Sequence, residues 1–252
     1  MSDIKFSIIT VSLNSEKYIE NTILSVIRQT YKNVEYIIID GSSTDSTLDI
    51  IHKYKDQLSY SISESDKGIA DAMNKGILKA TGDYILFINS DDYLINEDIL
   101  KQVSLLLNER LDLYIFKVLF MFPDNKEIIK MNIDLSILTN FKMGSCHQGH
   151  VVSRKLFQKH GLFDDSFKIA MDYDFLLRIY QKNIKFKSIG LVISCMRQEG
   201  LSSRNDWTSL KERFIEERRV HEKYCKNRWW KLLYSFYWLL YLPYRRIKLL
   251  IC

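Results

Sequence analysis

The sequence predicts an α/β fold with a mostly parallel central sheet flanked by helices. Short apolar runs at residues 6–11, 34–39 and 84–86 have the length and composition of buried strands. Segments with the apolar spacing of helices separate these runs. Strands that alternate with helices are typical of βαβ units, whose strands are parallel and whose crossovers are right-handed.

Three segments between the strands have the spacing of helices that cover a core. Over residues 19–27, apolar side chains recur at i, i+4, i+7 and i+8. A second helix is expected after Thr44 and Asp45, which are favourable N-terminal residues. A third stripe covers residues 69–80 and stops before Gly82, where a glycine ends a helix. Such stripes face a core far more often than they bind a ligand, so we interpret them as packing surfaces.

Each of the three strands ends in small polar or acidic residues. The first is followed by Ser12-Leu13-Asn14, the second by Asp40-Gly41-Ser42-Ser43-Thr44-Asp45, and the third by the segment 87–92, which ends Asn89-Ser90-Asp91-Asp92. In open parallel sheets, ligands bind in the crevice beyond the carboxyl ends of the strands. Adjacent carboxylates repel each other unless a cation lies between them, and Mg²⁺ commonly bridges a carboxylate to substrate phosphates. The alternative is a polar turn that caps the next helix.

Length and composition set the class of protein. The 252 residues correspond to one large domain or one and a half, and a hydrophobic content of 46% is ample for a core. The first five residues lead directly into a strand without the pattern of a signal peptide. The four widely spaced cysteines show no metal-ligand pattern, and we interpret them as reduced thiols of a cytosolic protein.

The charge is concentrated in the C-terminal tail. Residues 201–252 hold 12 basic and 5 acidic residues, a net charge of +7, whereas the whole chain carries +5. The remaining 200 residues therefore carry −2, which argues against a nucleic-acid-binding surface on the body of the protein.

The tail combines a charged helix over 208–225 with a run of aromatic and basic residues over 228–248. Its uncharged stretch, Leu232–Tyr244, is 13 residues long, and a transmembrane helix needs about 20. Aromatic side chains interleaved with Arg and Lys suit a membrane interface, so residues 229–251 are expected to bind a membrane surface. The alternative is a helix docked on its own domain or on a second subunit.

Taken together, these motifs resemble glycosyltransferase family 2, which comprises inverting enzymes of the GT-A fold, and especially its bacterial capsule, exopolysaccharide and lipopolysaccharide members. The resemblance covers roughly residues 4–200 and is carried by five stretches: 8–14, 40–47, 66–76, 89–92 and 161–178. It implies a GT-A domain over 1–203, with a Rossmann-like nucleotide-sugar-binding half (1–96) and an acceptor-side half (97–203). A helical segment, 204–252, follows.

The resemblance implies transfer of a sugar from a nucleotide-diphosphate donor, most naturally a UDP-sugar, to a hydroxyl of a saccharide acceptor. Asp172, at the start of a helix, matches the catalytic base, and a carboxylate there also interacts favourably with the helix dipole. Asp91 and Asp92 match the site of a divalent metal, Mg²⁺ or Mn²⁺. The residues expected to contact the nucleotide sugar are Ser12, Asn14, Asp40, Lys67, Asn74, Asn89 and Ser90.

Further along the chain, His147, Gln148 and Arg197 are expected on the acceptor or donor-sugar side, and a loop over 198–203 is expected to close over the donor. A structural role for His147 and a solvated position for Lys67 are the alternatives. His150 fits better as a strand residue.

Two positions depart from the family pattern. Leu13 stands where the family often has an aromatic residue that stacks on the nucleobase, so base recognition is expected to depend more on Asp40. Asn89 stands where the metal motif usually begins with Asp, which leaves Asp91 as the matching metal ligand.

Other classes of nucleotide-binding protein fit less well. A nucleotidyltransferase would need a glycine-rich phosphate loop near the N-terminus, and residues 11–15 contain no glycine. A P-loop NTPase would need GxxxxGK[ST] and a dinucleotide-binding protein GxGxxG, and neither motif is present. A non-catalytic, membrane-associated scaffold subunit is the second hypothesis. The basic aromatic tail favours a lipid-linked saccharide acceptor reached from the cytoplasmic face of the cell membrane, with the protein bound peripherally.

Overall fold

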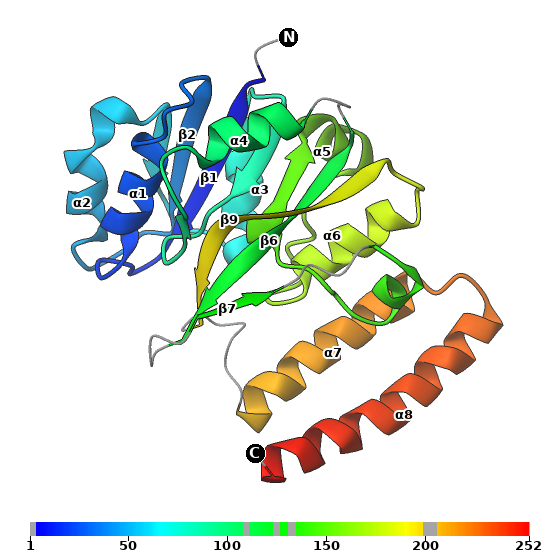
Figure 1. Ribbon diagram of the computed structural model, residues 1–252. Helices are drawn as coiled ribbons and strands as arrows, with labels where there is room; N and C mark the ends of the chain where they lie inside the picture. The colour runs from blue at the N-terminus through cyan, green and yellow to red at the C-terminus, as the bar shows by residue number, and fades with distance from the viewer. Residues whose placement is uncertain (1–3, 108–110, 123–126, 131–134, 199–205, 252) are drawn as a thin grey trace.

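The computed structural model describes residues 4–107, 111–122, 127–130, 135–198 and 206–251. One large sheet runs through the molecule, with helices on both of its faces and a helical hairpin at one end (Figure 1). The strands are β1 (Phe6–Ser12), β2 (Val34–Asp40), β3 (Tyr60–Ser63), β4 (Tyr84–Phe87), β5 (Tyr93–Leu94), β6 (Leu113–Met121), β7 (Glu127–Lys130), β8 (His150–Ser153) and β9 (Phe186–Arg197). The helices are α1 (Ile19–Ile27), α2 (Thr47–Lys53), α3 (Ile69–Lys79), α4 (Ile99–Leu106), α5 (Arg154–His160), α6 (Met171–Tyr180), α7 (Trp207–Lys223) and α8 (Arg228–Ile251).

The N-terminal half follows the predicted pattern. The strand order is β3-β2-β1-β4, and all three pairings are parallel. The three expected helices are present as α1, α2 and α3, which join consecutive parallel strands. This part of the sheet therefore has all its carboxyl strand ends at one edge.

The second half of the sheet is mixed rather than parallel. β8 lies antiparallel between β4 and β6, while β9 pairs with β6 in parallel through an irregular register near Phe116 and Lys117. β5 and β7 add antiparallel pairs at the edges. The α/β class is confirmed, and the antiparallel strands are a feature that the expected mostly parallel sheet did not include.

The sheet separates two apolar cores. Successive residues of β1 point to opposite faces, so Ile8 and Ile9 belong to different core clusters. One cluster lies between the sheet and α3, α5 and α6, and the other between the sheet and α1 and α4. The described cysteines, Cys146, Cys195 and Cys225, are thiols rather than disulfides.

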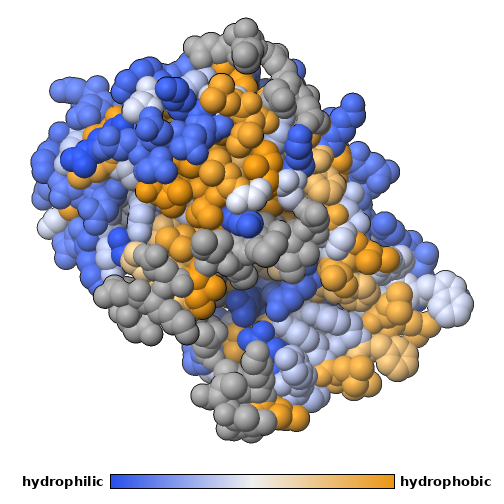
Figure 2. All heavy atoms as spheres, viewed as in Figure 1, coloured by the Kyte–Doolittle hydropathy of each residue, from blue (hydrophilic) through white to orange (hydrophobic). Residues whose placement is uncertain are grey.

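α7 and α8 form a hairpin beside α6 (Figure 1). Tyr234 and Trp238 of α8 are buried against Leu210 and Phe214 of α7. The opposite side of α8 is exposed, and orange side chains gather over this part of the molecule in Figure 2. Of the helices that the structure describes, none has the length and apolar character needed to cross a membrane.

Candidate active site

The polar ends of β1, β2 and β4 meet at one edge of the sheet, as predicted. Ser12 and Asp40 are partners in the parallel register of β1 and β2. The loop after β4 is tied to the β1 loop, because the hydroxyls of Ser15 and Ser90 lie 2.7 Å apart. Asn14 adopts a left-handed conformation with φ 49°, and its Oδ1 accepts a hydrogen bond from the Thr44 backbone N–H. Three loops therefore form one continuous polar surface.

Asp40 is buried at the centre of this surface. Its Oδ1 accepts hydrogen bonds from the hydroxyls of Ser12 (2.9 Å) and Ser43 (2.5 Å). Its Oδ2 accepts from the Ser43 backbone N–H (2.9 Å) and the Ser63 hydroxyl (2.7 Å). A carboxylate has about four acceptor positions, so those of Asp40 are occupied within the protein. A contact between Asp40 and a nucleobase stays a prediction, and it requires one hydroxyl to turn away.

Asp66 is a second carboxylate at this edge, and the predicted site residues did not include it. A Cβ atom on Gly41 would lie 2.5 Å from Asp66 Oδ2, so any side chain at position 41 would displace this carboxylate from its place against the loop after β2. Asp66 Oδ1 accepts a hydrogen bond from the Gly68 N–H at 2.8 Å. In the sequence, a glycine directly after a strand was the available signal that another group lies close to this loop. That this group is Asp66, 25 positions further along the chain, depends on the fold.

The segment 89–92 follows β4, and its two carboxylates lie in different environments. Asp92 is buried, and its oxygens accept hydrogen bonds from Gln148 Nε2 (2.8 Å) and the Arg197 backbone N–H (3.2 Å). Burial, with the neighbouring Asp91 carboxylate, raises the pKa of Asp92 well above its usual range. Asp92 therefore fixes the loop to β9 and to the 147–149 turn. Asp91 is half-buried and is the better placed of the two to bind a cation.

The residues of this loop fit a divalent metal bound together with a substrate. Asn89 Oδ1 is buried and has no hydrogen-bond partner in the described part of the chain, and amide and carboxylate oxygens are the ligands that Mg²⁺ and Mn²⁺ prefer. The described residues contain no cluster of three or more His, Cys, Asp or Glu side chains that would hold a metal ion. A metal here would therefore take most of its ligands from diphosphate and water, as Mg²⁺ commonly does.

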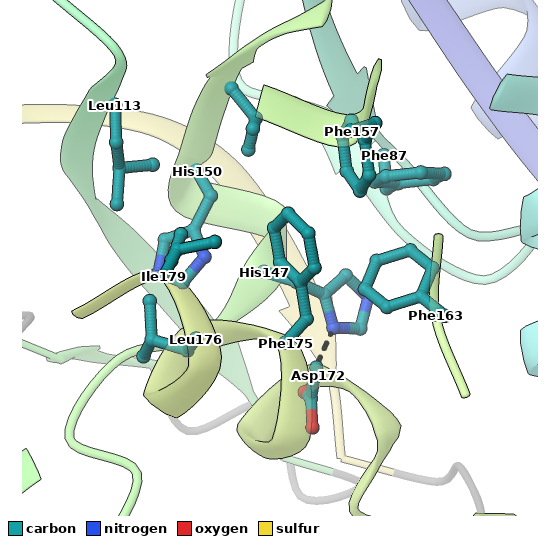
Figure 3. A pocket seen from close by; sticks show the side chains of 11 residues that line it. Phe87, Leu113, His147, His150, Phe157, Phe163, Asp172, Phe175, Leu176 and Ile179 are labelled. Carbon is teal, nitrogen blue, oxygen red and sulfur yellow. Dashed lines mark hydrogen bonds and ion pairs between the residues drawn. The ribbon is translucent and has the colours of Figure 1, made fainter. Parts of the chain in front are cut away.

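Asp172 is the second residue of α6, in agreement with the predicted carboxylate at a helix start. Its Oδ1 accepts a hydrogen bond from the Tyr173 N–H at 2.7 Å, and its Oδ2 lies 3.3 Å from His147 Nδ1. On its other side, His147 Nε2 lies 3.2 Å from Asn89 Nδ2. Because an amide nitrogen only donates, Nε2 accepts and Nδ1 carries the proton toward Asp172. Polar contacts therefore link Asn89, in the loop after β4, through His147 to Asp172 at the start of α6. Figure 3 draws the contact between His147 and Asp172.

An apolar pocket lies beside this chain. His147 and Asp172 line it together with Phe87, Phe163 and Phe175 (Figure 3). His150 also lines it and begins β8, in agreement with the expected strand position. Burial and, secondarily, the nearby His147 lower the pKa of His150 to about 3, so its ring is neutral at physiological pH. Asp172 thus has polar contacts on one side and an apolar wall on the other.

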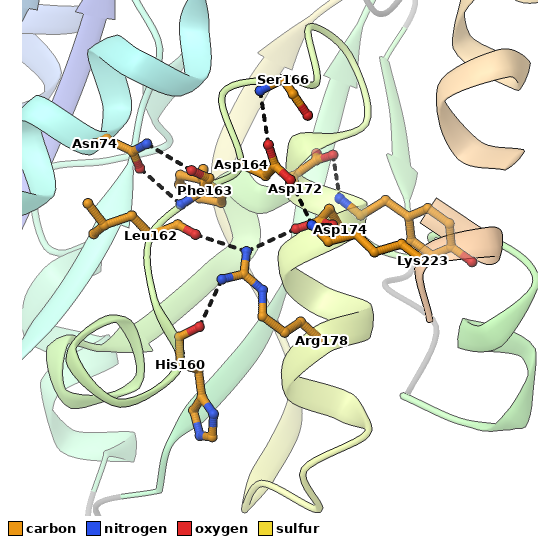
Figure 4. Close-up of polar contacts among 11 residues, drawn as sticks. Asn74, His160, Leu162, Phe163, Asp164, Ser166, Asp172, Asp174, Arg178 and Lys223 are labelled. Atoms are coloured by element: carbon orange, nitrogen blue, oxygen red, sulfur yellow. Dashed lines mark hydrogen bonds and ion pairs between the residues drawn. The ribbon is translucent and has the colours of Figure 1, made fainter. Parts of the chain in front are cut away.

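Other predicted site residues make contacts within the protein. The Asn74 side chain bonds both backbone groups of Phe163, at 2.9 and 3.0 Å (Figure 4). Lys67 Nζ is exposed and lies 3.7 Å from an Asp165 oxygen. The Arg197 guanidinium lies over the rings of Tyr18 and Tyr93, at 4.6 and 5.3 Å from their centroids.

Gln148 donates a hydrogen bond from its side-chain amide to the Asp92 carboxylate. Contacts of these residues with a sugar nucleotide or an acceptor stay predictions. Most of the expected donor-covering loop, residues 199–203, lies outside the described residues.

A search of family models matches residues 7–169 to the glycosyl transferase family 2 domain. A PGL/p-HBAD biosynthesis glycosyltransferase of Mycobacterium bovis is 32% identical over 180 residues, which are 69% of this chain and 69% of that protein.

Two solved structures are similar in fold. Staphylococcus aureus TarS 1–349 in complex with UDP-GlcNAc superposes with a TM-score of 0.69 at 22% identity, over 86% of this chain and 65% of that one. The mannosyltransferase PcManGT of Pyrobaculum calidifontis, in complex with GDP-Man and Mn²⁺, gives a TM-score of 0.69 at 16% identity, over 97% of this chain and 72% of that one. At these identities the likeness concerns the fold alone.

Proposed function

The chain belongs to glycosyltransferase family 2, and on that basis we propose that it transfers a sugar, with inversion, from a UDP-sugar to a hydroxyl of a lipid-linked saccharide in cell-surface polysaccharide synthesis. As a member of this family it is an enzyme that transfers sugars, with the GT-A fold. The observation that carries the proposal is the hydrogen-bonded chain Asn89–His147–Asp172, which connects the 89–92 segment after β4 to a carboxylate at the start of α6.

The donor binds across the loops that follow β1, β2 and β4. Ser12 and Asn14 contact nucleobase and ribose, beside the Asp40 carboxylate that accepts a hydrogen bond from Ser12 and the Asp66 carboxylate next to Gly41. A UDP-sugar is favoured because a carboxylate pairs naturally with the N–H of uracil, and because TarS is described with UDP-GlcNAc. Asp91 and the Asn89 amide oxygen would hold Mg²⁺ or Mn²⁺, which would offset the negative charge on the departing diphosphate.

Asp172 acts as the general base. The acceptor oxygen attacks the anomeric carbon from the face opposite the diphosphate and its proton passes to Asp172, while the bond from that carbon to the diphosphate oxygen breaks. A single displacement inverts the anomeric centre, so no covalent nucleophile is needed. His147 donates its Nδ1–H to Asp172 Oδ2 and thereby orients the carboxylate. The apolar wall beside Asp172 keeps water away from the reacting atoms.

The acceptor is proposed to be lipid-linked because of the outward face of α8. This face carries exposed apolar side chains at helical spacing: Trp229, Leu232, Leu233, Phe236, Leu239, Leu240, Tyr244 and Ile247. Arg228, Lys231 and Arg246 are exposed beside it. Apolar and aromatic side chains bordered by basic ones match the interface of an anionic bilayer, so we place the protein peripherally on the cytoplasmic face of the cell membrane. The other face of α8 packs on α7. Docking of the tail helix on its own chain, the alternative to membrane binding, therefore involves a different face of the same helix.

Donor turnover tests the proposed reaction. Release of UDP from a panel of UDP-hexoses and UDP-N-acetylhexosamines is measured with Mn²⁺ and a bacterial lipid extract as the source of acceptor. The wild type is expected to release UDP from one donor, and Asp172→Asn to lose about 10²–10⁴-fold in rate while binding UDP unchanged. Nucleotide binding without turnover of any donor would favour the scaffold function, and full activity of Asp172→Asn would remove its role as base.

A further inference from the structure

α7 holds the turn that leads into the catalytic helix. The Glu216 carboxylate accepts hydrogen bonds from three consecutive backbone N–H groups, those of Lys168 (2.9 Å), Ile169 (2.7 Å) and Ala170 (2.8 Å). Ala170 is the N-cap of α6 and has no side chain that can cap the helix. A carboxylate from another helix therefore fixes the backbone two residues before Asp172.

A second contact fixes the rotation of α6. The Tyr173 hydroxyl donates to the Thr139 carbonyl at 3.0 Å and lies 2.8 Å from His221 Nε2. Trp238 Nε1 donates to His221 Nδ1 at 3.0 Å, so Nδ1 accepts and Nε2 carries the proton toward Tyr173. Burial lowers the pKa of His221 to about 4, so this ring stays neutral at physiological pH. Because Tyr173 directly follows Asp172, anchoring its ring sets the direction in which Asp172 projects.

Lys223, the last residue of α7, makes a third contact with α6 and the segment before it. Lys223 Nζ lies 2.7 Å from both the Asp164 and the Asp174 carboxylates, and Arg178 also pairs with Asp174 at 2.9 Å (Figure 4). α7 therefore contacts the segment immediately before Asp172, the residue immediately after it, and the next residue along.

We propose that Glu216 is a positioning residue for sugar transfer, which acts through Asp172 and touches neither donor nor acceptor. The inference rests on the proposed role of Asp172 as the base. Glu216 is singled out because its hydrogen bonds go to backbone groups, so it sets where α6 begins. His221 is fully buried and Lys223 joins two carboxylates, so replacing either one disturbs packing or charge as well as position.

The test compares Glu216→Ala with Glu222→Ala, a matched control on the same helix whose exposed carboxylate pairs with Arg218. Displacement of a reacting group by about 1 Å costs about 10²-fold in rate, so Glu216→Ala is expected to lower kcat 10- to 100-fold. The UDP dissociation constant and its binding stoichiometry should stay within twofold, which shows that the fraction of folded protein is unchanged. Glu222→Ala should match the wild type. Glu216→Gln keeps the shape of the side chain and one acceptor oxygen, so its kcat should lie between those of Glu216→Ala and the wild type.

A double-mutant cycle separates positioning from general damage. If Glu216 acts through Asp172, then Glu216→Ala causes no further loss of rate when Asp172 is already Asn. A multiplicative loss in the double variant, weakened UDP binding, or wild-type kcat for both Glu216 variants would overturn the inference. Full activity of Asp172→Asn alone would instead refute the proposed base, so the two failures are distinguishable.

Discussion

Glu35 is predicted to stabilise the fold strongly without taking part in catalysis. It lies buried near the amino ends of β1 and β2, away from the candidate site, and bonds Lys5, Ser7, Thr81 and the Gly82 N–H. Burial raises the pKa of Glu35, but the hydrogen bonds from Ser7, Thr81 and Lys5 outweigh burial and lower it from 4.5 to about 2. At about 1.4 kcal/mol per pKa unit, this difference corresponds to about 3 kcal/mol of folding free energy.

The stabilisation by Glu35 depends on pH. Because the folded pKa lies below the unfolded one, the stabilisation is complete well above pH 4.5 and is lost as the pH falls through about 2. Glu35→Gln keeps the shape of the side chain and removes the charge. Urea unfolding followed by tryptophan fluorescence should show a loss of about 3 kcal/mol at pH 7, shrinking to about 1 kcal/mol at pH 3. UDP binding by the folded variant should be unchanged.

Equal stability of Glu35→Gln and the wild type at pH 7 would contradict the predicted role of Glu35. A difference in unfolding free energy between the two proteins that is the same at pH 3 as at pH 7 would also contradict it.

Three further predictions concern the site and the tail. His147→Ala should lower kcat about 10- to 100-fold in the UDP-release assay with unchanged UDP affinity, and a normal kcat would show that it does not orient Asp172. Gly41→Ala should weaken UDP binding about tenfold by calorimetry, since its Cβ would lie 2.5 Å from Asp66 Oδ2, whereas Gly190→Ala, with 3.8 Å to its nearest neighbour, should not. Replacing the exposed Trp229, Phe236 and Leu240 by Ser should weaken co-sedimentation with phosphatidylglycerol vesicles at least tenfold. The buried Trp238–His221 contact should stay intact. Unchanged sedimentation would exclude the outward face of α8 as the membrane-binding surface.

The N-terminal half could be predicted from the sequence because local patterns determine it. The apolar spacing over residues 19–27 and 69–80 gave α1 and α3, and the runs before Ser12 and Asp40 gave adjacent parallel strands. In the second half, β6 pairs with β9 about 73 residues away and β8 inserts antiparallel between β4 and β6. Such pairing depends on long-range packing, which a strand-length apolar run does not specify.

The candidate site shows the same division. The strand-end rule located Asn89, Asp91 and the loop around Asp40, and the family pattern placed Asp172 at a helix start, where the structure has it. The sequence did not show that Asp40 is already fully hydrogen-bonded or that Asp66 approaches Gly41, because both depend on contacts between separate loops.

The tail is a third example. Apolar and aromatic residues occur almost all around α8, so membrane binding and docking could not be separated in the sequence, whereas the structure assigns the inward side to α7 and leaves the other exposed.

Nucleotide binding is the most direct test of the proposed donor site. Calorimetry is performed with UDP, GDP, TDP and CDP, with and without Mn²⁺, on the wild type and on Asp91→Asn. The proposed site predicts that UDP binds with an affinity that depends on Mn²⁺, and that Asp91→Asn abolishes this dependence. UDP binding that is indifferent to both the metal and Asp91, or no binding of any nucleotide, would contradict the proposed donor site.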